Sequence, residues 1–220
     1  MKEAKNKIVL FLIIFSVVFN FSTNCSAREL FEFNGYSVTE ETEVANEVFL
    51  EAVKFSMNSL ISGNSIFLEE FLRKYKMSEE QFRKLPVTSG VMAIENWVNT
   101  IRYESDSVNW RKKDYFADIE KFFSRGGDCE DFAIAKLALL KYFYPCQETW
   151  FVIVQDINLK ICHAITVVVF DEVAYVMDNE MPTLSPRLVR LDRMCHYLPL
   201  YSANSDNGRI RLFLPNKIGR

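Results

Sequence analysis

The chain has 220 residues, with 26 lysines and arginines against 29 aspartates and glutamates, and its formal net charge is −3. This length is enough for one domain with a sizeable core, and the balanced charge without a basic stripe argues against nucleic acid as a partner. Because the sequence contains no internal repeat, no GxGxxG fingerprint and no P-loop pattern, cofactor chemistry is not favoured.

The N-terminus has the pattern of an export signal. Three lysines within the first seven residues precede the apolar run 8–21, and Cys25-Ser26-Ala27 offers small residues for cleavage. The run has 14 residues, which is short for a membrane span. We therefore expect residues 1–27 to be a secretory signal peptide and residues 28–220 to be a single exported domain. Lipid attachment at Cys25 is the rival interpretation, but Ser22-Thr23-Asn24 lacks the leucine and small residue that normally precede a lipidated cysteine.

Helical periodicity dominates the first half of the exported part. Residues 28–40 are expected to be irregular or extended, and 106–113 to be a polar connection. The spacing of apolar residues predicts amphipathic helices over 41–62, 66–75 and 88–103 and a short helix over 115–123. Ser78 followed by Gln81 has the form of a capping box.

The most informative segment begins at Gly126-Gly127, two glycines that end a loop. Asp128 then occupies the N-cap position of a helix predicted to run from Cys129 to about Phe143, and Asp128 with Asp131 imitates a capping box. The Cys129 sulfur would lie at the positive end of this helix, where a thiolate is stabilised. For a single cysteine without this context, a small buried core residue is the better interpretation.

The second half favours strands. Residues 150–154, 164–170 and 173–177 are rich in β-branched and aromatic side chains, and 209–214 alternates charged and apolar residues after an Asn-Gly turn. Helices followed by an antiparallel sheet predict an α+β fold.

Asp171-Glu172 is a natural two-residue turn between two of these strands. If residue 170 pairs with residue 173, His163 and Asp178 are diagonal neighbours on one face of the sheet, within reach of a hydrogen bond. With the start of the preceding helix packed against this face, Cys129 would be a nucleophile, His163 its base and Asp178 the group that orients the base. The alternatives are a strand histidine bound to a backbone carbonyl and a polar strand end. His196, the other histidine, is interpreted as structural.

Three carboxylates surround the cysteine, namely Asp128, Glu130 and Asp131. Their charges would disfavour a neighbouring thiolate, and a hard cation with oxygen ligands, such as Ca²⁺, would neutralise them. The alternative is that they are solvated and complement the helix dipole. Zinc is disfavoured because the block contains one cysteine and no histidine.

Three motifs together resemble the bacterial transglutaminase-like cysteine proteinases of the LapG type. They are Gly-Gly-Asp-Cys-Glu-Asp-Phe-Ala-Ile-Ala-Lys at 126–136, Cys-His-Ala-Ile-Thr-Val-Val-Val at 162–169 and Tyr-Val-Met-Asp-Asn at 175–179. Weaker agreement at Trp110, 114–117 and 198–204 extends the resemblance over roughly residues 90–215. The resemblance implies a papain/transglutaminase-like core, a triad of Cys129, His163 and Asp178, and calcium bound by Asp128, Glu130 and Asp131.

The resemblance also implies a role in the cell. Such proteases are periplasmic and calcium-dependent, and they clip a large surface adhesin near its N-terminus at a di-alanine site, which releases the adhesin and promotes biofilm dispersal. An inner-membrane receptor sequesters them when cyclic di-GMP is high, and Phe122 or Phe123 are candidates for the aromatic residue at which it docks. The rival functions are a protein-crosslinking transglutaminase with the same triad and a non-catalytic calcium- or receptor-binding module.

Four cysteines follow the predicted signal peptide, Cys129, Cys146, Cys162 and Cys195. If Cys129 is a free nucleophile, at most one intramolecular bridge can form among the others, and the sequence leaves its existence open.

Overall fold

The computed structural model describes residues 36–45, 47–180, 188–204 and 209–215. The predicted signal peptide, residues 1–27, lies outside these ranges. In chain order the described elements are β1 (Tyr36–Ala45), α2 (Glu47–Ile61), α3 (Ile66–Tyr75), α4 (Glu79–Arg83), α5 (Val87–Val98), α6 (Asp106–Asn109), α7 (Ile119–Arg125), α8 (Cys129–Phe143), β2 (Glu148–Asp156), β3 (Ile161–Phe170), β4 (Val173–Met177), β5 (Val189–Arg190), the 3₁₀ turn η2 (Leu191–Arg193), β6 (Tyr197–Asn204) and β7 (Arg209–Pro215).

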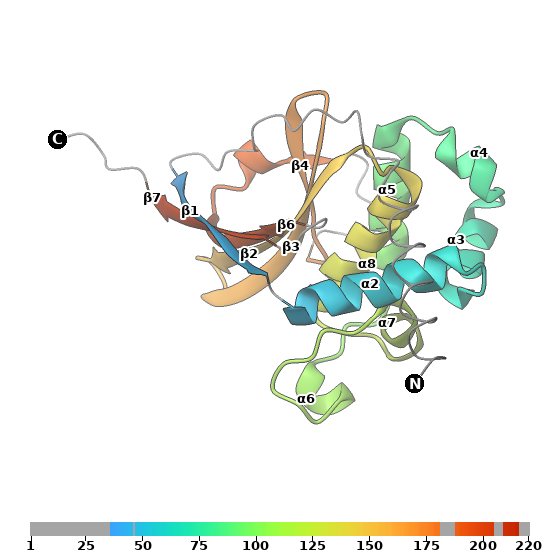
Figure 1. The fold of residues 1–220 in the computed structure, drawn as a ribbon, viewed down its shortest axis with the longest axis horizontal. Helices are drawn as coiled ribbons and strands as arrows, with labels where there is room; N and C mark the ends of the chain where they lie inside the picture. Colours follow the sequence, from blue (N-terminus) through green and yellow to red (C-terminus); the bar gives the residue numbers. More distant parts are fainter. Residues whose placement is uncertain (1–35, 46, 181–187, 205–208, 216–220) are drawn as a thin grey trace, which may run out of the picture. The chain divides into compact units, whose positions relative to one another are not determined.

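The strands form one antiparallel sheet in the order β1-β7-β6-β2-β3-β4-β5. Helix α8 packs against β3 and β2 and is itself flanked by α2, α5 and α7, so it lies between the sheet and the other helices (Figure 1). The predicted α+β fold with a central helix that begins at Cys129 is therefore confirmed.

Helix α8 is buried on nearly all sides, which explains why its sequence is apolar around its whole circumference. One side joins a core with the side chains of α3, α4, α5 and α7, and the other joins a smaller core that includes Phe49 of α2 and Phe151 of β2. Three small side chains of α8, Ala133, Ala135 and Ala138, are buried in these two cores. Thr166 of β3 donates its hydroxyl hydrogen to the Ala133 carbonyl oxygen at 2.8 Å, which fixes the helix against the strand.

The predicted helix over 41–62 was wrong in its first turn. Residues up to Ala45 belong to β1, which pairs with β7 at the other end of the chain, and the helix begins at Glu47. Val48 and Phe55, two of the apolar residues that defined the predicted face, are 57% and 61% exposed. The periodicity of residues 41–62 alone did not reveal that the first of them would pair with the distant strand β7.

Other predictions held more closely. Helix α3 spans the predicted 66–75, and the capping box of Ser78 and Gln81 is present with both of its hydrogen bonds. The helix predicted over 88–103 ends at Val98, because the chain leaves it to pair Tyr103 with Gly127. The short helix predicted over 115–123 lies at 119–125 instead, and the polar connection contains α6. Strands β5 and β6 were not predicted.

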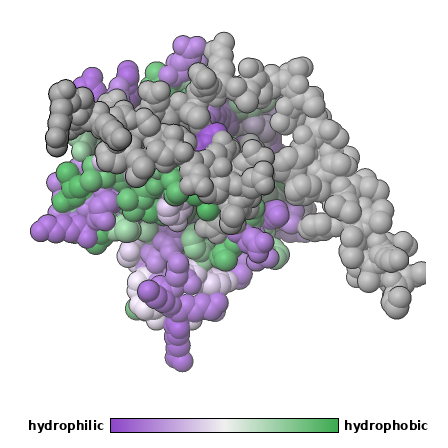
Figure 2. Space-filling view, turned by 60° about the vertical axis from the view of Figure 1, so that its left-hand side comes forward, coloured by the Kyte–Doolittle hydropathy of each residue, from purple (hydrophilic) through white to green (hydrophobic). Residues whose placement is uncertain are grey.

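Helix α6 and the residues after it form a largely hydrophilic projection at the bottom of Figure 2. Within the described ranges, no helix is both long and apolar enough to cross a membrane. No disulfide joins any two of Cys129, Cys146, Cys162 and Cys195 in the described part of the chain.

Candidate active site and acidic cluster

The loop before Cys129 requires both of its glycines. Gly126 adopts φ +79°, and a Cβ there would lie 2.3 Å from the Arg102 carbonyl oxygen. A Cβ on Gly127 would lie 2.2 Å from Asp131 Oδ2. Because the backbone must approach these groups so closely, the two glycines let the loop deliver Cys129 to the first turn of α8.

The predicted capping box at this helix is not formed. Asp128 occupies the N-cap position, but its side chain makes no capping hydrogen bond. Asp131 Oδ1 instead accepts a hydrogen bond from the Ala117 backbone N–H at 2.6 Å. The Asp131 carboxylate, which the local pattern assigned to the cap of α8, therefore binds the segment that precedes α7 instead.

The strand register that the two-residue turn predicts is present. Phe170 pairs with Val173 and Thr166 with Met177, and both turn residues have positive φ, as a type I′ turn requires. His163 and Asp178 lie just beyond these pairs. His163 Nε2 is 2.7 Å from Asp178 Oδ1, and both side chains are buried. This bond occupies Nε2, so Nδ1 is the ring nitrogen left for a second contact.

Asp178 is held by more than the histidine. Tyr197 at the start of β6 donates its hydroxyl hydrogen to Asp178 Oδ2 at 2.5 Å, and the Glu180 N–H donates to Oδ1 at 2.9 Å. Burial acts to raise the pKa of Asp178, but the hydrogen bonds and the His163 charge outweigh it and hold the pKa below its usual value. Asp178 is therefore an ionised group, suited to orient an imidazole and to stabilise its charged form.

Cys129 faces the same strand. The backbone N–H of Ala164, the residue after His163, lies within hydrogen-bonding range of the Cys129 sulfur. The thiol itself donates to Glu130 Oε2 at 3.2 Å, and within the described residues no hydrogen bond joins it to His163. Burial, followed by the Glu130 charge, raises the pKa of Cys129 despite its place at the helix end. The expected stabilisation of the thiolate by the helix is therefore outweighed, as the neighbouring carboxylates had suggested.

Carboxylates converge beside the cysteine in two overlapping groups. Ligand atoms of Asp106, Asp128 and Asp131 all lie within 4.8 Å of one another, and so do those of Asp106, Asp114 and Glu130. The three acids expected from the sequence are thus all in the cluster, but Asp106 and Asp114 were missed. The pairing of Tyr103 with Gly127 brings them in, and no local spacing indicates it.

Three of these carboxylates share one arrangement, in which a backbone N–H binds one oxygen and the other oxygen is buried without a partner. The N–H of Tyr115 binds Asp106 Oδ2, that of Ala117 binds Asp131 Oδ1, and that of Asp106 binds Asp128 Oδ2 at 3.4 Å. The buried oxygens without partners are Asp106 Oδ1, Asp128 Oδ1 and Asp131 Oδ2.

The electrostatics of the cluster agree with this geometry. Burial, reinforced by the Asp128 charge, raises the pKa of Asp106 to about 6 and that of Asp131 to about 8. Burial raises the pKa of Glu130 to about 9, and a side-chain hydrogen bond with Asp128 and the negative charge of Asp128 add to this effect. Fixed, unpartnered and mutually repelling oxygens are the donor set that a hard divalent cation prefers, so the residues present fit Ca²⁺.

Comparison with known proteins identifies the family. Residues 73–188, more than half of the chain, match the sequence model of the bacterial transglutaminase-like cysteine proteinases. The chain belongs to this family. The matched segment contains Cys129, His163 and Asp178 together with the whole acidic cluster. No curated protein matches the sequence.

Solved structures support the fold of this cysteine proteinase. Calcium-bound LapG from Legionella pneumophila is 21% identical, with a TM-score of 0.50, and the match covers 64% of this chain and 79% of LapG. A second LapG structure from this organism is 18% identical, with a TM-score of 0.53 and coverage of 77% and 88%. An EGTA-treated LapG is 18% identical, with a TM-score of 0.52 and coverage of 77% and 86%.

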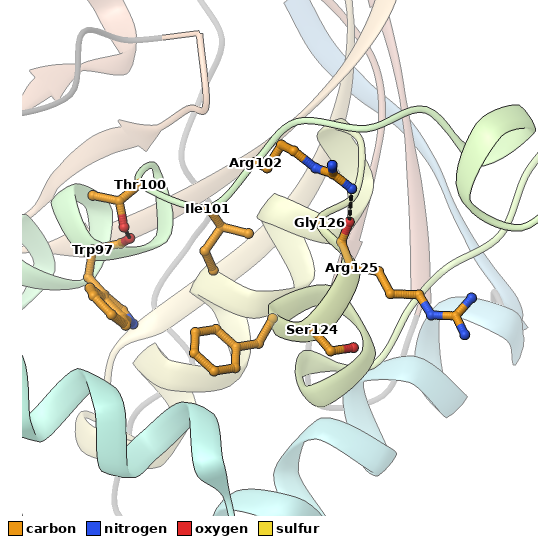
Figure 3. Close-up of a pocket in the computed structure, with 8 residues that line it drawn as sticks. Trp97, Thr100, Ile101, Arg102, Ser124, Arg125 and Gly126 are labelled. Atoms are coloured by element: carbon orange, nitrogen blue, oxygen red, sulfur yellow. Dashed lines mark hydrogen bonds between the residues drawn. The ribbon is translucent and has the colours of Figure 1, made fainter.

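The proteinase also has a pocket of about 360 Å³ beside the loop that leads to Cys129. Figure 3 shows Trp97 of α5 and Ile101, which lies beyond the end of this helix, among the residues that line the pocket. The Arg125 side chain points away, and its carbonyl oxygen accepts a 3.0 Å hydrogen bond from Arg102. Phe123 lines this pocket, whereas Phe122 is fully buried and packs edge-on against Phe132. Of these two neighbouring aromatics, Phe123 is therefore the one that is accessible from the pocket.

Proposed function

We propose that this protein is a periplasmic, calcium-dependent cysteine endopeptidase that cleaves a large surface adhesin near its N-terminus, at a di-alanine site. Cleavage releases the adhesin and promotes biofilm dispersal. An inner-membrane receptor that responds to cyclic di-GMP holds the protease when the nucleotide is abundant. Membership of a cysteine proteinase family supports the reaction class, and the adhesin, the receptor and the periplasm come from the resemblance to LapG-type proteases.

The observation that carries the proposal is the hydrogen bond of His163 to Asp178, on the strand that faces the start of α8. Asp178 is kept ionised, and it engages Nε2 and leaves Nδ1 for the thiol. Cys129 lies at the helix start, with its sulfur close to the residue after His163. This arrangement supports the proposed roles of Cys129 as nucleophile, His163 as general base and Asp178 as orienting carboxylate.

In the proposed reaction, His163 takes the proton of Cys129 through Nδ1, and the thiolate attacks the scissile carbonyl. The backbone N–H of Cys129 at the start of α8 stabilises the oxyanion. His163 then returns the proton to the leaving amine, and water attacks the acyl-enzyme with His163 again as the base. Asp178 stays ionised throughout and stabilises the imidazolium that forms in each step.

Asp128, Glu130 and Asp131, joined by Asp106 and Asp114, would hold the calcium ion. A bound divalent cation supplies positive charge and fixes carboxylate oxygens. Glu130 is both a member of the cluster and the hydrogen-bond acceptor of the Cys129 thiol. If a cation in the cluster binds the Glu130 carboxylate, this carboxylate no longer accepts the hydrogen bond of the Cys129 thiol. The thiol can then give its proton to His163, which would explain a requirement for calcium.

The receptor would dock outside the catalytic residues. Phe123, Trp97 and Ile101 give the pocket of Figure 3 an apolar wall that could take an apolar receptor side chain. Phe123→Asp should then abolish binding of the receptor's periplasmic domain in a pull-down, while cleavage of a free substrate continues.

The decisive test mixes the purified protein with N-terminal adhesin fragments that contain an Ala-Ala sequence, with calcium or with EGTA. We expect cleavage in calcium, loss of cleavage in EGTA and in Cys129→Ala, and normal cleavage by the matched variant Cys195→Ala. Mass spectrometry of the products identifies the new N-terminus. Incorporation of an amine probe without a new N-terminus would indicate a transglutaminase. Failure of Cys129 to react with iodoacetamide at neutral pH would indicate a non-catalytic module, and turnover by Cys129→Ala would refute the assignment.

A further inference from the structure

A buried ion pair lies behind Asp178 and has no place in the chemistry described above. Lys136 Nζ of α8 is 2.9 Å from Glu95 Oε2 of α5, and the two side chains are 1% and 6% exposed. Neither atom has another partner among the described residues. The pair therefore joins two helices through a contact that water does not reach.

The other oxygen of Glu95 reaches the strand end that carries Asp178. Glu95 Oε1 accepts a hydrogen bond from the Asp178 backbone N–H at 2.8 Å. Asn99, at the C-terminal end of α5, donates from Nδ2 to the Asp178 carbonyl oxygen at 2.9 Å and to Glu95 Oε1 at 3.2 Å. Side chains of α5 thus bind both backbone polar groups of Asp178.

These contacts lie where the sheet no longer holds the chain. The last pair of β3 with β4 is Thr166 with Met177, so Asp178 is the first residue beyond the ladder. Its carboxylate must nevertheless stay within hydrogen-bonding distance of His163 Nε2. Without Glu95 and Asn99, the backbone at Asp178 would lose both of these hydrogen bonds, and the place of its carboxylate would depend on Tyr197, the Glu180 N–H and His163 alone.

Stability alone is a weak explanation for this pair. Burial raises the pKa of Glu95 and lowers that of Lys136, and each charge only partly offsets the effect of burial on the other. A buried ion pair often contributes no more than two apolar side chains of the same volume. The ion pair has an effect on geometry that two apolar side chains would not have. Lys136 binds Glu95 Oε2 and so orients the carboxylate with Oε1 toward the Asp178 N–H.

We propose that Glu95, oriented by Lys136, is a positioning residue that fixes the Asp178 backbone and thereby aligns its carboxylate with His163. Asn99 completes the clamp from the carbonyl side. This inference rests on the proposed catalytic role of His163 and Asp178. Its physical content is the geometry of the His163–Asp178 bond, which can be measured whether or not the protein cleaves an adhesin.

The test compares two double variants that remove both charges and differ in one acceptor. Glu95→Gln with Lys136→Met keeps an amide oxygen for the Asp178 N–H, and Glu95→Leu with Lys136→Met removes it. With the adhesin fragment as substrate, we expect the first to keep kcat within about threefold of wild type. It loses the orienting contact of Lys136, but Asn99 Nδ2 still donates to the retained oxygen and holds it toward the Asp178 N–H. The second should lose kcat roughly 100-fold with KM unchanged, the scale of an error of about 1 Å in placing a catalytic group.

A spectroscopic readout separates this proposal from the proposed function. The chain has two histidines, so the His196→Gln background leaves His163 as the source of the downfield imidazole N–H proton in the NMR spectrum. That resonance should persist in the glutamine double variant and shift or disappear in the leucine one. If the resonance behaves in this way but no fragment is cleaved, the protease proposal fails and the positioning role stands.

Equal resonances or equal kcat values in the two double variants would overturn the positioning role. If the leucine variant does not fold, Asn99→Ala tests the same clamp from the half-exposed side, with the exposed neighbour Thr100→Ala as its control. Asn99→Ala should lower kcat and move the His163 resonance. A result indistinguishable from that of Thr100→Ala would refute the clamp.

Discussion

Tyr197→Phe is the most direct test of how the fold keeps Asp178 ionised. The change removes the hydroxyl group that donates to Asp178 Oδ2 at 2.5 Å, in a site where both side chains are almost fully buried. The ring that remains keeps its packing beside His163, whose ring centroid is 5.9 Å away, and beside His196 at 4.2 Å. The perturbation is therefore one hydrogen bond with little change in packed volume.

The size of the effect follows from the charge of the acceptor. A hydrogen bond to an ionised group contributes about 1.5–3 kcal/mol, and one to a neutral group about 1 kcal/mol. The pKa of Asp178 depends on the difference between these two contributions, about 0.5–2 kcal/mol. Because one pKa unit corresponds to about 1.4 kcal/mol, the variant should raise the pKa of Asp178 by about 0.4–1.5 units. In wild type this pKa is held below the usual value of 3.8.

The sign of the pH dependence follows from linkage. A carboxyl whose pKa is lowered by folding contributes stability above its unfolded pKa, about 3.9, and loses that contribution as the pH falls through its folded pKa. We expect Tyr197→Phe to lower the free energy of unfolding by about 1.5–3 kcal/mol at neutral pH. The deficit should shrink toward about 1 kcal/mol once Asp178 is protonated in both proteins.

Urea unfolding in EGTA at neutral pH and at stepwise lower pH measures this difference. The matched control is Tyr201→Phe on the same strand, because the described structure gives the Tyr201 hydroxyl no hydrogen-bond partner. A deficit that stays constant with pH, or one that Tyr201→Phe reproduces, would show that the hydroxyl does not act through the ionised Asp178.

The remaining predictions concern the acidic cluster and the β-turn. Asp106→Asn should reduce the rise in Tm that calcium produces in differential scanning calorimetry, because Asp106 belongs to both carboxylate groups. The control Asp192→Asn, at an exposed residue, should leave this rise unchanged. Equal shifts in the two variants would show that Asp106 is not part of the calcium site. In EGTA, the Tm should fall as the pH rises from about 4 to about 9. Burial raises the pKa of Asp131 to about 8, and a group whose pKa is raised by folding contributes stability that is lost as the pH rises through its folded pKa. A Tm that rises over this range would contradict the burial of these acids. Asp171→Asn with Glu172→Gly should raise the free energy of unfolding by about 1 kcal/mol, because both turn residues have positive φ; denaturant unfolding that shows no gain would argue against strain in this turn.

The sequence was sufficient where the information is local. The glycine pair, the helix from Cys129 and its end near Phe143 follow from neighbouring residues, and the structure has them where they were predicted. The bond between His163 and Asp178 spans 15 residues, yet a two-residue turn fixes the strand register and with it the diagonal pair. Alternation of side chains along a strand then decides which of them share a face.

Other features depended on chain segments that meet only in the folded protein. Helical periodicity over 41–45 gave no sign of the pairing with β7, and a single parallel bridge at Gly127 brings Asp106 to the cluster. Tyr197 and Glu95 approach Asp178 from β6 and α5, elements with no local link to β4. The preference of the Cys129 thiol for Glu130 reflects burial and charge around the helix start, which only the packed structure determines. Local spacing thus singled out Cys129, His163 and Asp178. Tertiary packing decided the direction in which the pKa values of Cys129 and Asp178 are shifted, the hydrogen bonds of all three residues and the groups that hold them in place.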